Sequence, residues 1–211
     1  DCITPHTIST TEITSNSATL NWVGTADEYI IKYKLVNDTV VNTVTVSDTT
    51  YTLTDLAPAE TYTFTIQSSC GEDFSSITET QTFSTLCGPI EEVVWFEDFE
   101  SALSNQTVAN DIMRCWNVLR SAAFWNGNFP RIYHEGYAPA AHSGSVTIEF
   151  KGSENLLVLP EFAADVNTLQ FSFYANTTAA TAESAGFMEI GIMTDIDDLN
   201  SFIVLDTVEP V

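Results

Sequence analysis

Three acidic residues, Glu97, Asp98 and Glu100, occur within four positions of a short aromatic segment. Carboxylates can bind a hard cation such as Ca²⁺, which takes six to eight oxygen ligands drawn from several chain segments. Side chains at neighbouring positions of extended backbone face opposite sides, so other segments would have to complete a site. The same pattern also fits a solvated edge strand in a very acidic protein. On the residues alone, both interpretations stay open.

The long aromatic stretch over residues 116–137 is the best candidate in the sequence for ligand binding. Sugars stack on flat aromatic faces, while neighbouring amides and charges hydrogen-bond their hydroxyl groups. The alternative is that most of these rings fill a core. The residues that we expect to bind a glycan are Trp125, Tyr137, Tyr133 and Asn126.

No set of residues indicates catalysis. The three histidines, His6, His134 and His142, are scattered, and the sequence contains no recognisable Ser-His-Asp or Cys-His arrangement. Paired carboxylates can hydrolyse glycosides, but that chemistry needs a fixed separation across a cleft, which a sequence does not define. We therefore expect no catalytic residues and a protein that is not an enzyme.

The cysteines indicate the compartment. Cys2, Cys70, Cys87 and Cys115 are even in number, widely spaced, and free of any C-x-x-C pair. Such usage is typical of disulfides formed in an oxidising environment. The sequence therefore predicts a secreted or cell-surface protein.

The charge balance excludes several kinds of partner. Acidic residues outnumber basic ones 29 to 6, which gives a formal net charge of −23. A surface this negative repels phosphate backbones and anionic lipid, so we expect no nucleic-acid partner. No apolar run reaches 18 residues, so no membrane span is expected either.

The first part of the chain alternates apolar and polar residues with a period of two, which predicts strands that each bury one face. Turn-forming residues separate these runs, as in an antiparallel sandwich. The alternating apolar residues are Ala18, Leu20 and Trp22, then Tyr29, Ile31 and Tyr33, and later Tyr62, Phe64 and Ile66.

Over residues 1–87 the sequence resembles a fibronectin type III domain. The resemblance depends on Trp22, on Tyr33, and on the run Leu56-Ala57-Pro58-Ala59-Glu60-Thr61-Tyr62. It implies that the hydroxyl of Tyr62 bonds to upstream backbone at a corner between the sheets. It also implies that Cys2 and Cys70 lie at the same pole and form a disulfide.

The composition changes after Glu91, and we predict a second, antiparallel β domain over residues 88–211. The expected strands cover 145–150, 155–160, 168–175, 187–194 and 201–208. The stretch 114–145 is expected to be irregular, with at most a helical turn or two at 109–114.

This second part resembles the MAM-like and cleaved-adhesin jelly rolls of secreted bacterial surface proteins. The resemblance is carried by Phe96-Glu97-Asp98-Phe99-Glu100, Cys115-Trp116, His142-Ser143-Gly144-Ser145, 157–160, 169–174 and 189–195. It implies a structural Ca²⁺ site with Asp98, Glu100 and Glu97 as candidate ligands, and a disulfide between Cys87 and Cys115. Domains of this type usually continue into further strands, so we expect the jelly roll to be truncated at Val211.

Three threonines follow an aspartate in a short pattern that looks like the O-glycosylation acceptors of some bacterial groups with such surface proteins. Chance also produces so short a pattern. The candidate acceptors are Thr39, Thr49 and Thr207.

The sequence thus predicts an all-β chain, a fibronectin type III-like sandwich followed by a jelly-roll sandwich. We expect a non-catalytic adhesion or ligand-binding module of a larger exported protein, with a cell-surface glycan or protein as partner. Two alternatives stay open: accessory domains of an exported peptidase or glycoside hydrolase, and a structural stalk or filament subunit.

Overall fold

The structure is a computed structural model that describes residues 2–92, 94–100, 115–120, 130–134, 141–150, 155–176 and 186–209. The chain divides into two compact units, Asp1–Gly88 and Pro89–Val211, and each is treated by itself. In the described residues the regular structure is β apart from short 3₁₀ turns such as η1 (Val166–Thr168) and η3 (Leu199–Ser201). The all-β fold class is confirmed.

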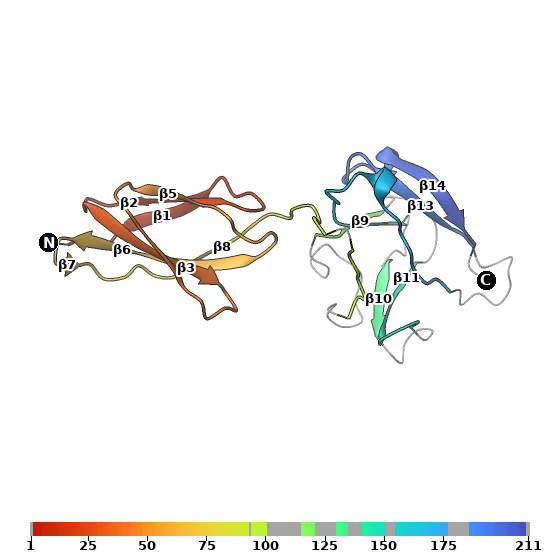
Figure 1. Cartoon of the computed structure of the whole chain (residues 1–211), viewed down its shortest axis with the longest axis horizontal. Helices are drawn as coiled ribbons and strands as arrows, with labels where there is room; N and C mark the ends of the chain where they lie inside the picture. The colour runs from red at the N-terminus through yellow and green to blue at the C-terminus, as the bar shows by residue number, and fades with distance from the viewer. Residues whose placement is uncertain are drawn as a thin grey trace. The chain divides into compact units, whose positions relative to one another are not determined.

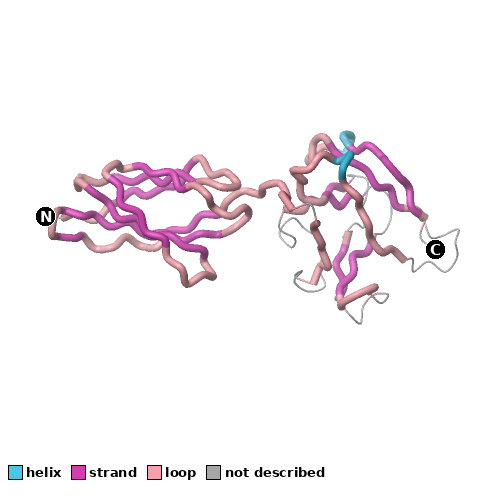
Figure 2. Tube along the Cα trace, in the orientation of Figure 1, coloured by secondary structure: helices cyan, strands magenta, loops and turns pink. Residues whose placement is uncertain are grey.

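The first unit is a sandwich of two antiparallel sheets (Figures 1 and 2). One sheet has the order β1-β2-β5, formed by His6–Thr11, Ala18–Val23 and Thr50–Leu53. The other has the order β4-β3-β6-β7, with β8 also paired to β6. It is formed by Asn42–Val46, Glu28–Leu35, Thr61–Cys70, Asp73–Phe74 and Gln81–Ser84.

The core of this unit follows the predicted alternation. Along β6 every second residue from Tyr62 to Ser68 is buried, and the residues between are half-buried. Trp22 meets the edge of the Tyr29 ring with 5.3 Å between centroids, an arrangement that aromatic quadrupoles favour. The buried apolar residues are Ala18, Leu20, Trp22, Tyr29, Ile31, Leu53, Leu56, Tyr62, Phe64, Ile66 and Phe83.

Tyr62 forms the corner that the resemblance implies. The backbone N–H of Ala57 donates to the Tyr62 hydroxyl oxygen at 2.9 Å, and the ring stacks on Phe83 with 5.6 Å between centroids. The connection that it pins has positive φ at two non-glycine residues, Asp55 (57°) and Ala59 (53°). Such backbone is sparsely populated, so packing and hydrogen bonds must hold it in place.

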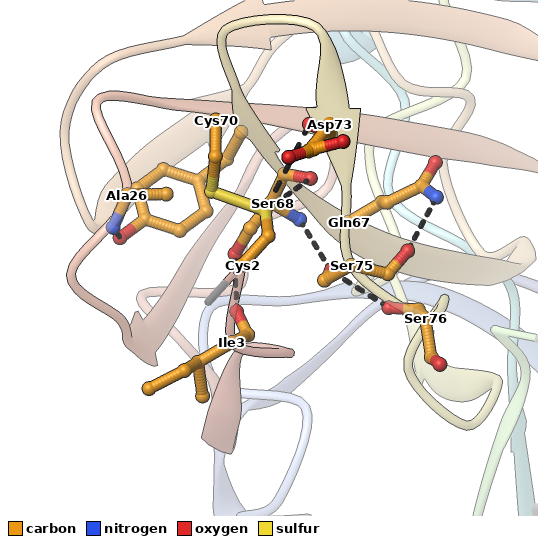
Figure 3. The surroundings of a disulfide bond; sticks show 10 residues. Cys2, Ile3, Ala26, Gln67, Ser68, Cys70, Asp73, Ser75 and Ser76 are labelled. Atoms are coloured by element: carbon orange, nitrogen blue, oxygen red, sulfur yellow. Dashed lines mark hydrogen bonds between the residues drawn. A yellow bond between two sulfur atoms is a disulfide. The ribbon is translucent and has the colours of Figure 1, made fainter.

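A disulfide joins Cys2 to Cys70, the last residue of β6, with 5.8 Å between their Cα atoms (Figure 3). The buried Ser68 lies beside it, where its hydroxyl donates to the Ile3 carbonyl at 2.7 Å and its N–H donates to Ser75 Oγ at 2.9 Å. The bond spans a sequence separation of 68 residues. Closing a loop of this length restricts the unfolded chain by on the order of 4 kcal/mol.

In the second unit the described strands form three antiparallel pairs (Figure 1). The pairs are β9 (Asn117–Arg120) with β12 (Asn155–Val158), β10 (Arg131–His134) with β11 (Val146–Glu149), and β13 (Met188–Met193) with β14 (Phe202–Val208).

Four of the five strands expected in this unit are present as β11, β12, β13 and β14. The prediction of a strand over 168–175 is wrong, because Thr168 ends the η1 turn and residues 169–175 pair with no strand in the described part of the chain. Strands β9 and β10 lie in the stretch expected to be irregular, so that expectation is also wrong for those residues. The helical turn expected at 109–114 lies outside the described residues.

A small aromatic core holds the described part of the second unit together. Trp116, Ile132 and Val146 are buried at its centre. Trp95 and Phe99 pack on Trp116, with ring centroids 5.9 and 5.7 Å away. The opening segment of the unit is therefore anchored by its aromatic side chains.

Replacing Tyr62 by phenylalanine tests the corner. Tyr62→Phe leaves the Ala57 N–H without its acceptor, and we expect a loss of about 1–1.5 kcal/mol of unfolding free energy, measured by denaturant titration. Tyr51→Phe, a half-buried tyrosine on β5, is the matched control and should change stability by less than about 0.5 kcal/mol. Equal effects of the two substitutions would contradict the role of the corner.

Candidate functional site

The carboxylate of Glu100 is the most heavily bonded acidic group described in the second unit. Its Oε1 accepts the N–H groups of Ser145 and Val146 at 2.7 and 2.9 Å, and its Oε2 accepts the Ser145 hydroxyl at 2.8 Å. Gly144 has φ +67°, and a Cβ there would collide with the same carboxylate. Glu100 thus ties the opening segment to the start of β11.

The other two acids cap local backbone. Glu97 Oε1 accepts the Phe99 N–H at 2.7 Å, and Asp98 Oδ1 accepts the Glu100 N–H at 3.0 Å. Among the described residues, no group of three or more His, Cys, Asp or Glu side chains is placed to hold a metal ion. In the described residues, Glu97, Asp98 and Glu100 therefore act as hydrogen-bond acceptors for backbone N–H groups. Calcium binding stays a prediction.

Of the four residues expected to bind a glycan, one is described. Tyr133 lies on β10, is half-buried, and has the Arg131 guanidinium 5.0 Å from its ring centroid. One face of this ring is therefore covered by a cation. Trp125, Asn126 and Tyr137 lie outside the described residues.

An aromatic pair that the sequence analysis missed lies elsewhere in the second unit. His142 and Tyr174 stack with 3.3 Å between ring centroids and 8° between planes, although Tyr174 is 77% exposed. The two residues are 32 positions apart, so no local sequence pattern predicts their contact. The sequence signal available was the position of Tyr174, which alternation places on the opposite side from Phe171 and Phe173.

The three threonines expected to carry O-glycans are all exposed. Thr39 and Thr207 each donate their backbone N–H to the preceding aspartate, Asp38 and Asp206, at 2.6 and 2.8 Å. The local geometry leaves the threonine side chains accessible. Their modification stays a prediction.

All four cysteines are oxidised. Cys87 and Cys115 are disulfide-bonded, as Cys2 and Cys70 are, and no cysteine is free in the described part of the chain. The cysteines therefore have a structural role, as members of disulfide bonds. The pairing of Cys87 with Cys115 stays a prediction.

Two of the described groups with shifted pKa values, Tyr33 and Asp165, lie outside the candidate sites. Burial raises the pKa of Tyr33, with smaller contributions from Tyr51, Tyr62 and Asp55. Hydrogen bonds from the backbone and side chain of Asn167 lower the pKa of Asp165. Asp165 begins the η1 turn, so this shift reflects capping.

Within the described residues, no helix has the length and apolar character needed to cross a membrane.

Residues 4–81 match the family model of the fibronectin type III domain. No curated protein matches the chain. Among solved structures, a two-domain fibronectin type III segment of chicken tenascin is 31% identical, with a TM-score of 0.37 and coverage of 39% of this chain and 49% of that one. The chain thus spans about half the length of that segment.

Two other solved structures are also similar over the first unit. A computationally redesigned β-sandwich protein is 28% identical, with a TM-score of 0.36 and coverage of 39% of this chain and 94% of that one. The corresponding domain of human contactin 1 is 15% identical, with a TM-score of 0.41 and coverage of 44% and 84%.

The family match, the two-sheet sandwich and the Tyr62 corner agree that residues 4–81 form a fibronectin type III domain. Domains of this family are typically non-catalytic modules of extracellular or adhesion proteins, they mediate protein interactions, and they sit beside other domains. Together with the disulfides, this indicates an extracellular location.

Replacing Glu100 by glutamine distinguishes an anchor from a metal ligand. Glu100→Gln weakens the charge-assisted bonds to Ser145 and Val146, and we expect the unfolding free energy to fall by about 1–2 kcal/mol. The loss should be equal in EDTA and in millimolar Ca²⁺. Asp98→Asn is the control, because an amide oxygen still accepts the Glu100 N–H, and it should be nearly neutral. A wild-type protein stabilised by Ca²⁺, with both variants losing that gain, would instead establish the calcium site.

Proposed function

We propose that this chain is a non-catalytic adhesion or ligand-binding part of a larger exported protein. In this proposal the fibronectin type III domain is a spacer, and the second unit, a MAM-like or cleaved-adhesin-like jelly roll, recognises a glycan or protein at a cell surface.

The observation that carries the proposal is the contrast between the two units. The first unit buries most of its large aromatic residues in a cross-linked sandwich, which suits a stable spacer. The second unit leaves several aromatic rings in solvent, and exposed rings are typical of recognition surfaces. These rings are Phe96 (78%), Phe171 (56%), Tyr174 (77%) and Phe187 (67%).

Binding to intact cell surfaces tests this function. Fluorescently labelled chain should bind saturably, with a dissociation constant of about 1–100 μM, and excess unlabelled chain should displace it. Trp125→Ala should weaken binding about tenfold if the glycan site predicted from the sequence binds the cell surface. Phe74→Ala, in the fibronectin type III domain, should leave binding unchanged. Circular dichroism checks that both variants fold. Binding that does not saturate, or that is absent at 100 μM, would refute adhesion.

A second candidate function, a structural subunit that associates through strand edges, is favoured by β14. In the described residues this strand pairs with β13 alone. Three consecutive apolar residues of the strand, Ile203, Val204 and Leu205, are 51%, 45% and 61% exposed. An exposed apolar edge strand offers unpaired backbone groups to another chain.

Sedimentation velocity tests this association. Because each chain carries a net charge of −23, association should be suppressed at about 10 mM salt and should rise at about 500 mM. Leu205→Lys should abolish it, because a charge on an edge strand opposes pairing. Val40→Lys, at a 63% exposed position in the first unit, is the matched control and should leave it unchanged. A strict monomer at both salt concentrations would exclude the subunit role.

A further inference from the structure

The stacked rings of His142 and Tyr174 form an exposed aromatic surface, which we call the platform. The two rings are nearly parallel, 8° apart, with 3.3 Å between centroids. The stack covers one face of Tyr174, yet 77% of the residue is exposed. The other face of the ring is therefore presented to solvent in an orientation that His142 fixes.

In extended backbone Tyr174 shares its side of the chain with polar residues. Phe171 and Phe173 contact each other, with 5.4 Å between ring centroids, as side chains two residues apart do in extended backbone. Alternation then places the opposite set of side chains together on the Tyr174 side. We call this set the polar row: Gln170, Ser172, Tyr174 and Asn176, all of them exposed.

We propose that Tyr174, backed by His142 and flanked by the polar row, binds a neutral glycan. This inference rests on the proposed adhesion function and deepens it by naming the ligand class and a site. A pyranose has one face of C–H groups, which packs on an aromatic ring, and a rim of hydroxyls. Ser172 and Asn176 lie about 6.6 Å to either side of Tyr174 along the backbone, where they can bond that rim.

The polar row favours a sugar over an apolar protein surface. An apolar partner that covered Tyr174 would also cover Ser172, Asn176 and Gln170, and would remove their water without replacing its hydrogen bonds. A glycan supplies hydroxyls for each of them. The stack on His142 adds preorganisation, because a ring already held in place loses little freedom when the ligand binds.

The net charge of the chain restricts the class of glycan that can bind. A net charge of −23 repels sialylated and uronic-acid glycans. The ligand class is therefore neutral oligosaccharides built of hexose or N-acetylhexosamine units.

A glycan array followed by calorimetric titration tests the site. The whole chain is applied to arrayed neutral oligosaccharides, with sialylated and uronic-acid glycans as comparison. The strongest neutral oligosaccharide is then titrated against variants. Tyr174→Ala should weaken binding about tenfold or more, and Tyr174→Phe should stay within about threefold because the ring remains. His142→Ala should have an intermediate effect, because the ring loses its backing.

Phe74→Ala is the matched control, since Phe74 is a 56% exposed ring in the fibronectin type III domain and lies outside the platform. It should bind as the wild type does, and circular dichroism should show all four variants folded. Wild-type affinity in Tyr174→Ala, binding confined to acidic glycans, or no neutral glycan bound would each overturn the inference. If the chain adheres to cells and neutral glycans neither bind nor compete, the platform fails while the adhesion function stands.

Discussion

Both units depend on one geometric constraint, the alternation of side chains between the two sides of extended backbone. Along β6 it sends Tyr62, Phe64 and Ile66 into the sandwich and leaves their neighbours nearer to solvent. Between Leu169 and Asn176 the same alternation accounts for the contact of Phe171 with Phe173. One rule thus accounts for the core of the first unit and for a ring contact in the second.

The acidic segment shows how tertiary structure decides the role of a carboxylate. Glu100 is positioned to accept three hydrogen bonds from Ser145 and Val146, and Gly144 leaves room for it. Those donors are 45 residues or more away in sequence. A carboxylate that neutralises backbone N–H groups and one that binds a cation look the same in a sequence, because both need only negative oxygen atoms.

The first unit was largely predictable, because its strands carry strong period-2 patterns and the Leu56–Tyr62 run has a specific geometric role. The second unit was less predictable from its sequence. Strands β9 and β10 are four residues each, too short for alternation to stand out. The segment 168–175 alternates well but pairs with no strand among the residues that the structure describes, and strand formation also needs a neighbouring chain segment. The contact of His142 with Tyr174 depends on tertiary structure, which no local pattern encodes.

In the proposed spacer role, the disulfide between Cys2 and Cys70 has a mechanical consequence. Tension applied along the backbone enters at Cys2 and passes through the sulfur bridge directly to the end of β6. Strands β1 to β5, and β6 up to Cys70, lie in the bypassed loop, so pulling cannot lengthen them while the bridge is intact. Reduction of this single covalent link would add the whole loop to the length that the chain can reach under load.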